Sequence, residues 1–304
     1  MLDSLFQEID IDTGELIFEW RASQHFAINS TFSSLGGGGH DRASAFDFFH
    51  INSIDKDENG DYIISSRHSH TVACVSQYTG ETIWVLGGKV NEFRDLSDGK
   101  ATDFSWQHDA RWHASNRTLT VFDNASNSHA DPNADSRGMV IYLDIPRREA
   151  TLLAAYYHPY HIHTASQGNV QILDETGRAF VAWGHSAAYS EYTADGQLEC
   201  NAHFGASAYF GFGRVVSYRV LKGEWTGHPQ TQPDAVVIED TVFASWNGAT
   251  EVSAWRLETW DFRSNEPSAG LSISKTPYRL ASMRRLDSRR KSRSLRSFNI
   301  LFSA

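Results

Sequence analysis

Three short polar segments interrupt strand-like sequence and carry the side chains best suited to chemistry. The segments are Phe-Phe-His-Ile-Asn-Ser at residues 48–53, Ser-Ser-Arg-His at 65–68 and Trp-Gln-His-Asp-Ala-Arg-Trp at 106–112. His and Arg resist burial in a sheet unless they are partnered. Arg presents a planar fork of donors that suits sulfate or phosphate oxygens, and His can donate, accept or attack. The three segments therefore predict a site that handles an oxyanion.

Composition indicates a globular chain with an acidic body. Its 304 residues are 40% hydrophobic and 12% aromatic, which is enough to bury a substantial core. The net charge of −10 is uneven, because nine of the 27 basic residues but only one of the 37 acidic residues follow residue 274. Residues 1–274 thus carry 18 basic and 36 acidic residues. A body this acidic repels nucleic acid backbones, so we expect no nucleic acid partner.

The cysteines and the N-terminus bear on the cellular compartment. Cys74 and Cys200 lie far apart, which gives no metal-binding spacing and leaves one long-range disulfide possible. The N-terminus lacks the basic and apolar regions of a signal peptide, and no apolar run reaches the length of a membrane span. These features predict a cytoplasmic protein. Glycosylation sequons at Asn29, Asn116 and Asn124 leave open a secreted form whose leader is missing.

The sequence around the polar segments is typical of an all-β protein. Helical periodicity is hard to find, and short β-rich runs bounded by Gly, Asn and Asp recur throughout. One kind of hairpin places apolar strands on both sides of a Thr-Gly or Asp-Gly turn, at residues 5–20, 71–88 and 187–204. A second kind precedes it, with runs that begin at Asn59, Asn116, Gly168 and Asp240. Two hairpins per unit make a four-stranded blade, which predicts a β-propeller.

This architecture would bring the polar segments together. The innermost strand of each blade lines the central channel of a propeller. We expect His50 to open one such strand, Arg67 to end its partner, and His108 to open the equivalent strand one unit later. Only about four units can be counted, fewer than a closed ring of this type needs. We therefore expect an incomplete propeller that lacks N-terminal blades.

Composition also changes toward the C-terminus. We expect the propeller to occupy residues 1–262 and a basic Ser/Arg-rich tail to occupy residues 263–304. The tail contains the run Arg-Arg-Leu-Asp-Ser-Arg-Arg-Lys-Ser-Arg-Ser at residues 284–294, which has no apolar period. Such a segment is typical of disorder.

A set of motifs follows a fixed order along residues 3–260. Within the first half they are DFFHINSI at 47–54, IISSRH at 63–68, TGETIWVLGG at 79–88, WQHDA at 106–110 and TVFDN at 120–124. SQGNVQ, GRVVSY and SWNGATE follow at 166–171, 213–218 and 245–251. Each motif alone is weak, but the ordered set resembles the arylsulfotransferase family, and most closely its fungal branch. Members of that family are six-bladed β-propellers that move a sulfuryl group between phenols without a nucleotide donor.

The resemblance implies a role for each matching residue. His108 resembles the histidine that becomes transiently sulfated, and His50 and Arg67 resemble the pair that binds the sulfuryl oxygens. Asn52, His68 and Trp106 are expected to contact the substrate. The implied partners are a small aryl sulfate and a phenol in a ping-pong reaction, with no cofactor and no metal.

The chain departs from the family pattern in one respect. The family's site includes a further histidine from a blade well upstream of the motif around His50. Only 49 residues precede His50 here, too few to hold that blade. His25 and His40 lie in loop-like sequence and are poor substitutes for that histidine.

Several other interpretations compete with an enzyme of this kind. A non-catalytic propeller that binds partners through its channel is one, and the motif at 79–88 also resembles the tryptophan-docking repeat of quinoprotein oxidoreductases. His158, His161 and His163 suggest a transition metal, but no nearby Cys or carboxylate completes the set, and structural lining is favoured. Residues 55–61 imitate a calcium loop, but the twelfth position is Ser66 and a hairpin turn is favoured. Five tryptophans are expected to pack blades rather than bind ligand: Trp20, Trp84, Trp106, Trp112 and Trp246.

Overall fold

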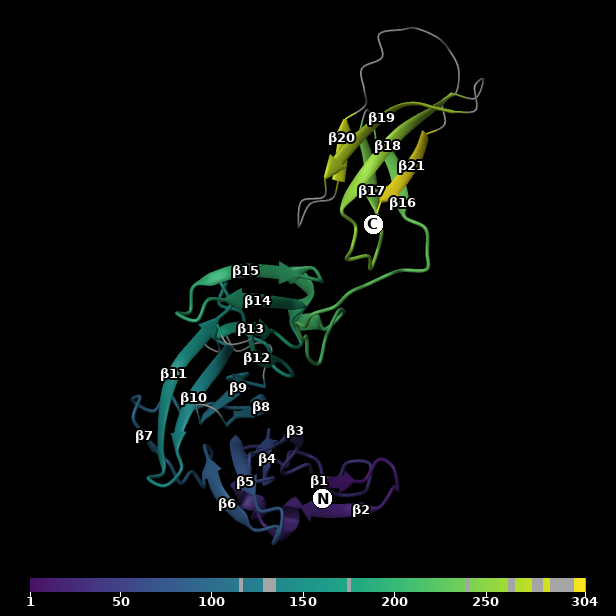
Figure 1. Ribbon diagram of the computed structural model, residues 1–304. Helices are drawn as coiled ribbons and strands as arrows, with labels where there is room; N and C mark the ends of the chain where they lie inside the picture. Colours follow the sequence, from purple (N-terminus) through teal and green to yellow (C-terminus); the bar gives the residue numbers. More distant parts are fainter. Residues whose placement is uncertain are drawn as a thin grey trace. The chain divides into compact units, whose positions relative to one another are not determined.

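The protein is antiparallel β-structure with very little helix. A computed structural model describes residues 1–114, 117–127, 135–173, 176–238, 241–261, 266–274, 281–284 and 298–303. The helices in these ranges are three 3-10 turns, η1 (Ala22–Gln24), η2 (Ile28–Ser30) and η3 (Ser207–Phe212). The predicted all-β class is confirmed. The chain divides into two compact units, Met1–Lys222 and Gly223–Ala304 (Figure 1).

Unit 1 contains a strand pair and three larger sheets. The pair is β1 (Leu5–Ile9) with β2 (Leu16–Arg21), and the first sheet is β3 (Ile51–Lys56), β4 (Tyr62–Ser66), β5 (Thr71–Val75) and β6 (Thr82–Leu86). The second has the order β7-β11-β10-β9-β8, with β7 (Arg94–Asp95), β8 (His108–His113), β9 (Thr118–Asp123), β10 (Arg137–Asp144) and β11 (Glu149–Tyr157). The third is β12 (Asn169–Leu173), β13 (Arg178–Ala182), β14 (Ala188–Tyr192) and β15 (Leu198–His203).

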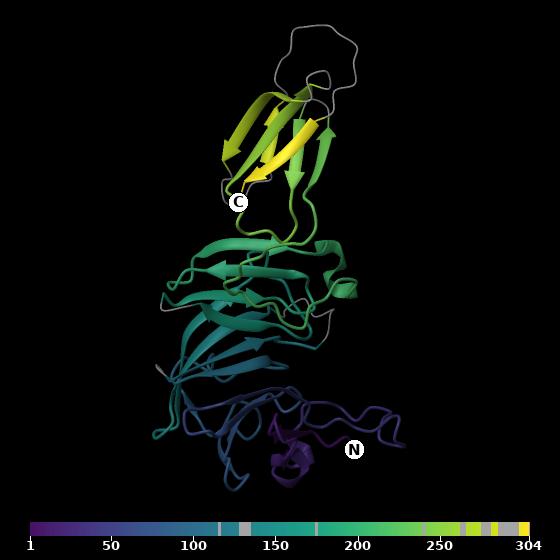
Figure 2. The same cartoon turned by 45° about the vertical axis from the view of Figure 1, so that its right-hand side comes forward.

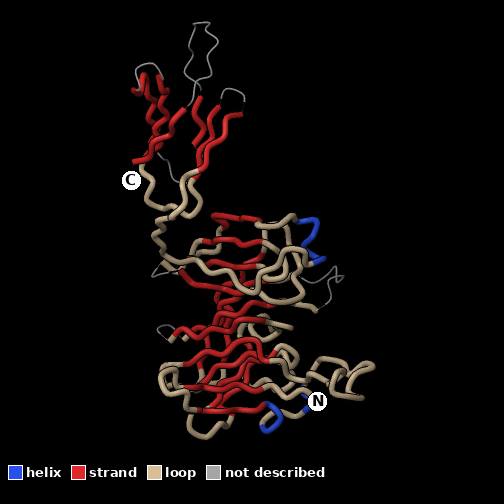
Figure 3. Tube along the Cα trace, turned by 90° about the vertical axis from the view of Figure 1, so that its right-hand side faces the viewer, coloured by secondary structure: helices blue, strands red, loops and turns tan. Residues whose placement is uncertain are grey.

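The three larger sheets follow one another in layers along unit 1 (Figures 2 and 3). In each sheet the polar edge strand leads into a meander of antiparallel hairpins, and these edge strands are β3, β8 and β12. β3 and β8 are neighbours, because the Ser53 hydroxyl accepts the Ala110 N–H at 3.0 Å. The sequence expectation that equivalent strands of successive units lie side by side therefore holds for β3 and β8.

Glycine turns set the hairpins as the sequence predicted. Gly14, Gly80 and Gly196 have φ values of 71°, 74° and 84° and lie in the turns of β1–β2, β5–β6 and β14–β15. This left-handed backbone is open to Gly at little cost. The segment that imitates a calcium loop is likewise the β3–β4 hairpin turn, with Gly60 at φ 88°.

Apolar side chains fill the space between successive layers. Alternate residues of a strand face opposite sides of the sheet. Ile63 accordingly packs with Leu119 and Met139 of the second sheet, while its neighbour Ile64 packs with Phe6 and Trp20 beneath β1–β2. Between the second and third sheets a further cluster includes Phe122, Val170, Val181 and Trp183. The first two layers are thus held in place by burial on both faces of β3–β6.

Unit 2 contains two three-stranded sheets. One has the order β16-β17-β20 and the other β19-β18-β21, with β16 (Asp234–Ile238), β17 (Thr241–Ser245), β18 (Ala254–Asp261), β19 (Glu266–Ser274), β20 (Ala281–Arg284) and β21 (Phe298–Ser303). Three of these strands lie within residues 263–304, where the sequence predicted a disordered tail. Most of the basic run at 284–294 lies outside the described residues. The division at residue 262 stays a prediction.

Two smaller expectations can be placed on the fold. Cys74 is buried, Cys200 is exposed and both are free thiols, so the one possible disulfide is absent. Among the described residues, no helix is long and apolar enough to cross a membrane.

Candidate functional site

The structure places His50, Arg67 and His108 near one another, where strands of the first two sheets begin or end. His50 directly precedes β3, Arg67 directly follows β4, and His108 is the first residue of β8. One loop joins two of them: Arg67 Nη2 donates to the Ala165 carbonyl at 3.1 Å, and the Gln167 N–H donates to His108 Nε2 at 3.2 Å. A guanidinium and a second imidazole beside a buried imidazole form a setting in which an oxyanion could be bound.

The protonation of His108 is set by Asn124. The His108 side chain is buried at 2% exposure, and its Nδ1 lies 2.7 Å from Asn124 Oδ1. Asn124 Nδ2 donates to the carbonyls of Thr164 and Gln167 at 2.8 and 3.0 Å, so its oxygen must face the imidazole. Nδ1 therefore carries the hydrogen, and Nε2 holds the lone pair. Burial, together with the charges of Arg67 and His50, lowers the pKa of His108 to about 4.

Sequence reasoning gave Asn124 no role at this site. It was counted only as a motif residue and as part of a sequon, but the side chain is fully buried and fully hydrogen-bonded. A signal was present in the hairpin, because His108 pairs with Phe122 in the β8–β9 register. The residue two positions after Phe122 therefore falls beside His108, just beyond the end of β9.

Asp47 orients the imidazole of His50. The His50 Nδ1 lies 2.5 Å from Asp47 Oδ2, and the pair is partly exposed. Burial acts to raise the pKa of the Asp47 carboxyl, but the hydrogen bond and charge of His50 outweigh it and the pKa is lowered. The contact with Asp47 uses Nδ1 of His50, so Nε2 is the nitrogen that could contact an anion.

His68 forms a bridge between Asp47 and Arg67. Arg67 Nη1 donates to His68 Nε2 at 3.1 Å, so His68 Nδ1 carries the hydrogen and donates to the Asp47 carbonyl at 2.7 Å. The rings of His50 and His68 are 4.8 Å apart. Both nitrogens of His68 are thus committed to Arg67 and to the Asp47 backbone, so a contact with substrate would use the ring and not these atoms.

Trp106 forms an aromatic wall beside the cations. The Arg67 guanidinium lies 5.0 Å from the Trp106 ring centroid, and the His70 ring stands edge-on to it at 4.8 Å. Trp106 has a φ of 54°, an uncommon conformation for so bulky a residue. His50 and Gln167 share this left-handed region, with φ values of 60° and 65°. Such backbone conformations cluster at functional sites, where the surrounding structure imposes them.

The comparison with known protein families bears on this geometry. A sequence model of the arylsulfotransferase (ASST) family matches residues 1–205, more than half of the 304 residues. The chain belongs to the arylsulfotransferase family. The matched range contains the three residues predicted to carry the chemistry and Asn124. No curated protein matches the chain in sequence.

Solved structures show only distant likeness to this arylsulfotransferase-family chain. A protein of unknown function from Bacteroides caccae is 10% identical over 86% of this chain and 67% of its own, with a TM-score of 0.37. Hydrazine synthase from Kuenenia stuttgartiensis is 12% identical over 74% of this chain and 51% of its own, with a TM-score of 0.34. A protein from Lactobacillus plantarum is 14% identical over 79% of this chain and 59% of its own, with a TM-score of 0.33. The chain thus spans about half to two thirds of the length of these structures.

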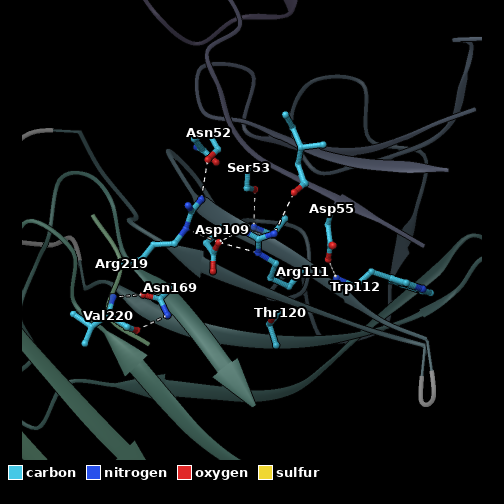
Figure 4. A network of polar contacts seen from close by, with 12 residues as sticks. Asn52, Ser53, Asp55, Asp109, Arg111, Trp112, Thr120, Asn169, Arg219 and Val220 are labelled. Atoms are coloured by element: carbon cyan, nitrogen blue, oxygen red, sulfur yellow. Dashed lines mark hydrogen bonds and ion pairs between the residues drawn. The ribbon is translucent and has the colours of Figure 1, made fainter. Parts of the chain in front are cut away.

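A second polar network adjoins the site of this arylsulfotransferase-family chain. Asn52 Nδ2 donates to the Gln107 carbonyl at 2.6 Å, directly before His108. In Figure 4, Arg219 lies between Asn52 and Asp109, donating to the Asn52 carbonyl at 3.0 Å and pairing with Asp109 Oδ1 at 2.7 Å. Arg111 pairs with the same carboxylate oxygen at 2.8 Å. Sequence reasoning missed Arg219, because nothing local in the run 213–222 indicates a path back to β3 and β8.

The other histidines singled out by sequence do not join the site. His25 stacks on Trp20 with ring centroids 5.1 Å apart, and His40 is exposed. The three histidines at 158–163 separate: His158 stacks near His203, His161 pairs with Asp135, and His163 hydrogen-bonds the Ser126 carbonyl. The three side chains thus have different neighbours, and their role as structural lining stays a prediction.

Metal-ligating side chains also come together within the described part of the chain. Asp47, His50 and His68 could each offer one ligand atom within 4.8 Å of one another, as could Asp57, Asp61 and Cys74. In the first group, His50 Nδ1 contacts Asp47 Oδ2 and both ring nitrogens of His68 are hydrogen-bonded, so His68 has no nitrogen left for a metal. In the second, burial raises the pKa of the Cys74 thiol well above its usual range, which opposes the thiolate that a metal needs.

The five tryptophans fall into two groups. Trp20 and Trp84 are buried between layers, as a packing role requires. Trp106 instead faces Arg67 at the site, and Trp112 and Trp246 donate their indole N–H to Glu58 Oε2 and the Thr231 carbonyl at 2.6 and 2.7 Å. Trp112 also packs against the core cluster that contains Leu119 and Met139, so the packing expectation agrees with Trp20, Trp84 and Trp112.

Proposed function

We propose that this chain transfers a sulfuryl group from an aryl sulfate to a phenol, without a nucleotide donor, through a sulfo-His108 intermediate. The observation that carries the proposal is the tautomer of His108. A buried neutral imidazole whose Nδ1 hydrogen is held by Asn124 directs its lone pair at Nε2, next to Arg67 and His50. Family membership supports the same reaction class.

The proposed reaction has two displacements. His108 Nε2 attacks sulfur, forming an N–S bond while the aryl O–S bond breaks and the phenoxide takes a proton from water. A second phenol then forms an O–S bond, the N–S electron pair returns to the imidazole, and the phenolic proton leaves to water. Arg67 and His50 would hold the equatorial oxygens, and such donors are worth about 3–4 kcal/mol each. Because the Gln167 N–H hydrogen-bonds Nε2, it has to withdraw before attack.

Substrate binding would use the walls of the same site. Trp106 would pack against the aryl ring. Asn52 would hold the backbone at Gln107 beside the ring, and His68 would hold the Arg67 guanidinium. Successive layers with their polar edge strands β3, β8 and β12 support a β-propeller, with each layer as one blade. We extend the proposal to a propeller domain over residues 1–262.

The test is release of 4-nitrophenol from 4-nitrophenyl sulfate, with phenol as acceptor. His108→Ala is expected to abolish release, because it removes the nucleophile. The matched control is His113→Ala on the same strand, whose Nε2 hydrogen-bonds Thr120 Oγ1 at 3.1 Å away from the site. His113→Ala is expected to retain release. A folded chain without activity, or equal loss in both variants, would refute the proposal.

A further inference from the structure

A tyrosine side chain lies at the proposed nucleophile. The rings of Tyr218 and His108 are 6.0 Å apart and nearly perpendicular, with the edge of one toward the face of the other. The Arg219 guanidinium lies over the Tyr218 ring at 5.1 Å, and the charge of Arg67 also acts on its hydroxyl. Tyr218 is therefore a phenol between two cations, beside the imidazole that is proposed to carry the sulfuryl group.

Backbone and side-chain hydrogen bonds fix the segment that carries Tyr218. The Gly168 N–H donates to the Tyr218 carbonyl at 3.0 Å. Asn169 exchanges two hydrogen bonds with the backbone of Val220, at 2.9 Å each, as Figure 4 shows. Gln171 does the same with Lys222, at 2.7 and 2.9 Å. The segment therefore follows β12, and Tyr218 is held at the site by the residues that follow Gln167.

The Tyr218 side chain is available for reaction. The residue is 45% exposed, and its hydroxyl has no hydrogen-bond partner among the described residues. Tyrosine hydroxyls usually have a hydrogen-bond partner when they are buried. The Tyr218 hydroxyl is therefore available to solvent or to a ligand. Burial raises the pKa of Tyr218, while the charges of Arg219 and Arg67 oppose that effect.

We propose that Tyr218 is an internal acceptor, and that in the absence of external phenol it becomes O-sulfated from sulfo-His108. The inference rests on the proposed function. The Tyr218 oxygen forms a bond to sulfur, the N–S bond to His108 breaks with its electron pair returning to Nε2, and the phenolic proton leaves to water. The product is a tyrosine sulfate beside Arg67 and Arg219, and His108 is left free to accept a second sulfuryl group.

The experiment uses the full chain incubated with 4-nitrophenyl sulfate alone, followed by digestion and mass spectrometry of the peptide that contains Tyr218. We expect that peptide to gain the mass of one sulfuryl group, and His108→Ala to prevent the gain. We also expect a burst of 4-nitrophenol that the Tyr218→Phe variant halves, because one of two acceptor atoms is lost.

Tyr209 supplies a matched control. It is also 45% exposed and also lies near a guanidinium, with Arg214 at 4.9 Å from its ring, but it has no ring contact with His108 among the described residues. The Tyr209→Phe variant is expected to keep the full burst and the modified Tyr218.

The outcomes separate the two proposals. Release of 4-nitrophenol to added phenol, without sulfation of Tyr218, overturns the internal acceptor and leaves the transferase intact. Sulfation spread equally over Tyr209 and Tyr218 also overturns it, because the site would not direct the transfer. No release under any condition in a folded chain refutes both.

Discussion

At His108, the position of one hydrogen depends on a single amide side chain. Because Asn124 Nδ2 is committed to the carbonyls of Thr164 and Gln167, only its oxygen is left to meet the imidazole. The alternative tautomer would place a hydrogen on Nε2, where the lone pair is needed for attack. In the proposed reaction, Asn124 is thus a positioning residue whose effect passes through His108 and not through contact with the substrate.

Replacing Asn124 with Leu is expected to lower kcat by up to roughly 10⁴, the loss found when a catalytic imidazole is left in the wrong tautomer. The direct readout is the ¹⁵N chemical shifts of the His108 ring, which report which nitrogen is protonated. We expect the Nδ1–H form in the native chain and a mixture in Asn124→Leu. The same variant with unchanged ring shifts and unchanged kcat would show that Asn124 is only structural.

The acid limit of activity should lie well below that of an ordinary histidine. Protonated Nε2 cannot attack, and the pKa of His108 is lowered from 6.5 to about 4 by burial and by neighbouring cations. We therefore expect kcat/KM for the aryl sulfate to fall as pH decreases through about 4, since this parameter reports the free enzyme. Initial rates across that range test it. A fall centred near 6.5 would contradict a dry, neutral His108.

Folding stability should weaken in the same direction. Like that of His108, the pKa of His70 is lowered to about 4, chiefly by burial. Between pH 6.5 and pH 4 these two side chains are therefore protonated in the unfolded chain and neutral in the folded chain. Stability is thus greatest above the unfolded pKa and decreases as pH falls toward 4, by about 2 kcal/mol or more. Urea denaturation at several pH values measures this. The same measurement identifies the pH range in which the protein is folded, and initial rates are compared within that range.

At the level of elements, a buried ion pair connects strands β9 and β10 behind the site. Asp123 Oδ2 accepts from Arg137 Nε at 2.9 Å, and its Oδ1 accepts the N–H groups of Ser105 and Ala125 at 3.0 and 2.9 Å. Ser105 leads into the His108 segment, and Ala125 follows Asn124. The pair therefore fixes both chain segments that approach the imidazole.

Arg137→Ala should cost about 3–5 kcal/mol of unfolding free energy, because it leaves Asp123 buried and uncompensated. The matched control is Arg147→Ala in the β10–β11 turn, where the side chain is exposed and pairs with Asp144 at 2.9 Å. That change is expected to cost no more than about 1 kcal/mol. Urea midpoints of the two variants give the comparison. Similar costs would show that the Asp123 pair is not effectively buried.

The sequence predicted these elements better than it predicted their contacts. Thr-Gly and Asp-Gly turns between apolar runs identified the hairpins, and hairpin geometry then placed His50, Arg67 and His108 at strand ends. Tyr218 and Arg219 reach the site through the irregular segment at residues 213–222, and Asn124, which follows β9, is held by the irregular segment at residues 164–167. Such segments have no periodicity to reveal their path, because their conformation comes from contacts with strands many residues away.

At the scale of the molecule, every described group at the site and every partner given to it above belongs to the unit Met1–Lys222. The three layers, the loop that carries Gln167 and the segment that carries Tyr218 are all within it. The family match at residues 1–205 ends before that last segment. Residues 206–222 therefore contribute to the site beyond the range that the family model matches, within a stretch where only the motif at 213–218 carries the resemblance.

A pair of truncations tests whether this unit is sufficient. The chain ending at Lys222 is expected to unfold cooperatively and to keep the Nδ1–H form of His108, because all hydrogen bonds around the imidazole are retained. The chain ending at Phe212 should lose stability, because it exposes β12 where Tyr218, Val220 and Lys222 pair. Thermal unfolding with ¹⁵N spectra measures both effects. Equal behaviour of the two truncations would mean that the segment after Phe212 neither supports β12 nor shapes the site, and the arguments for Tyr218 and Arg219 would then fail together.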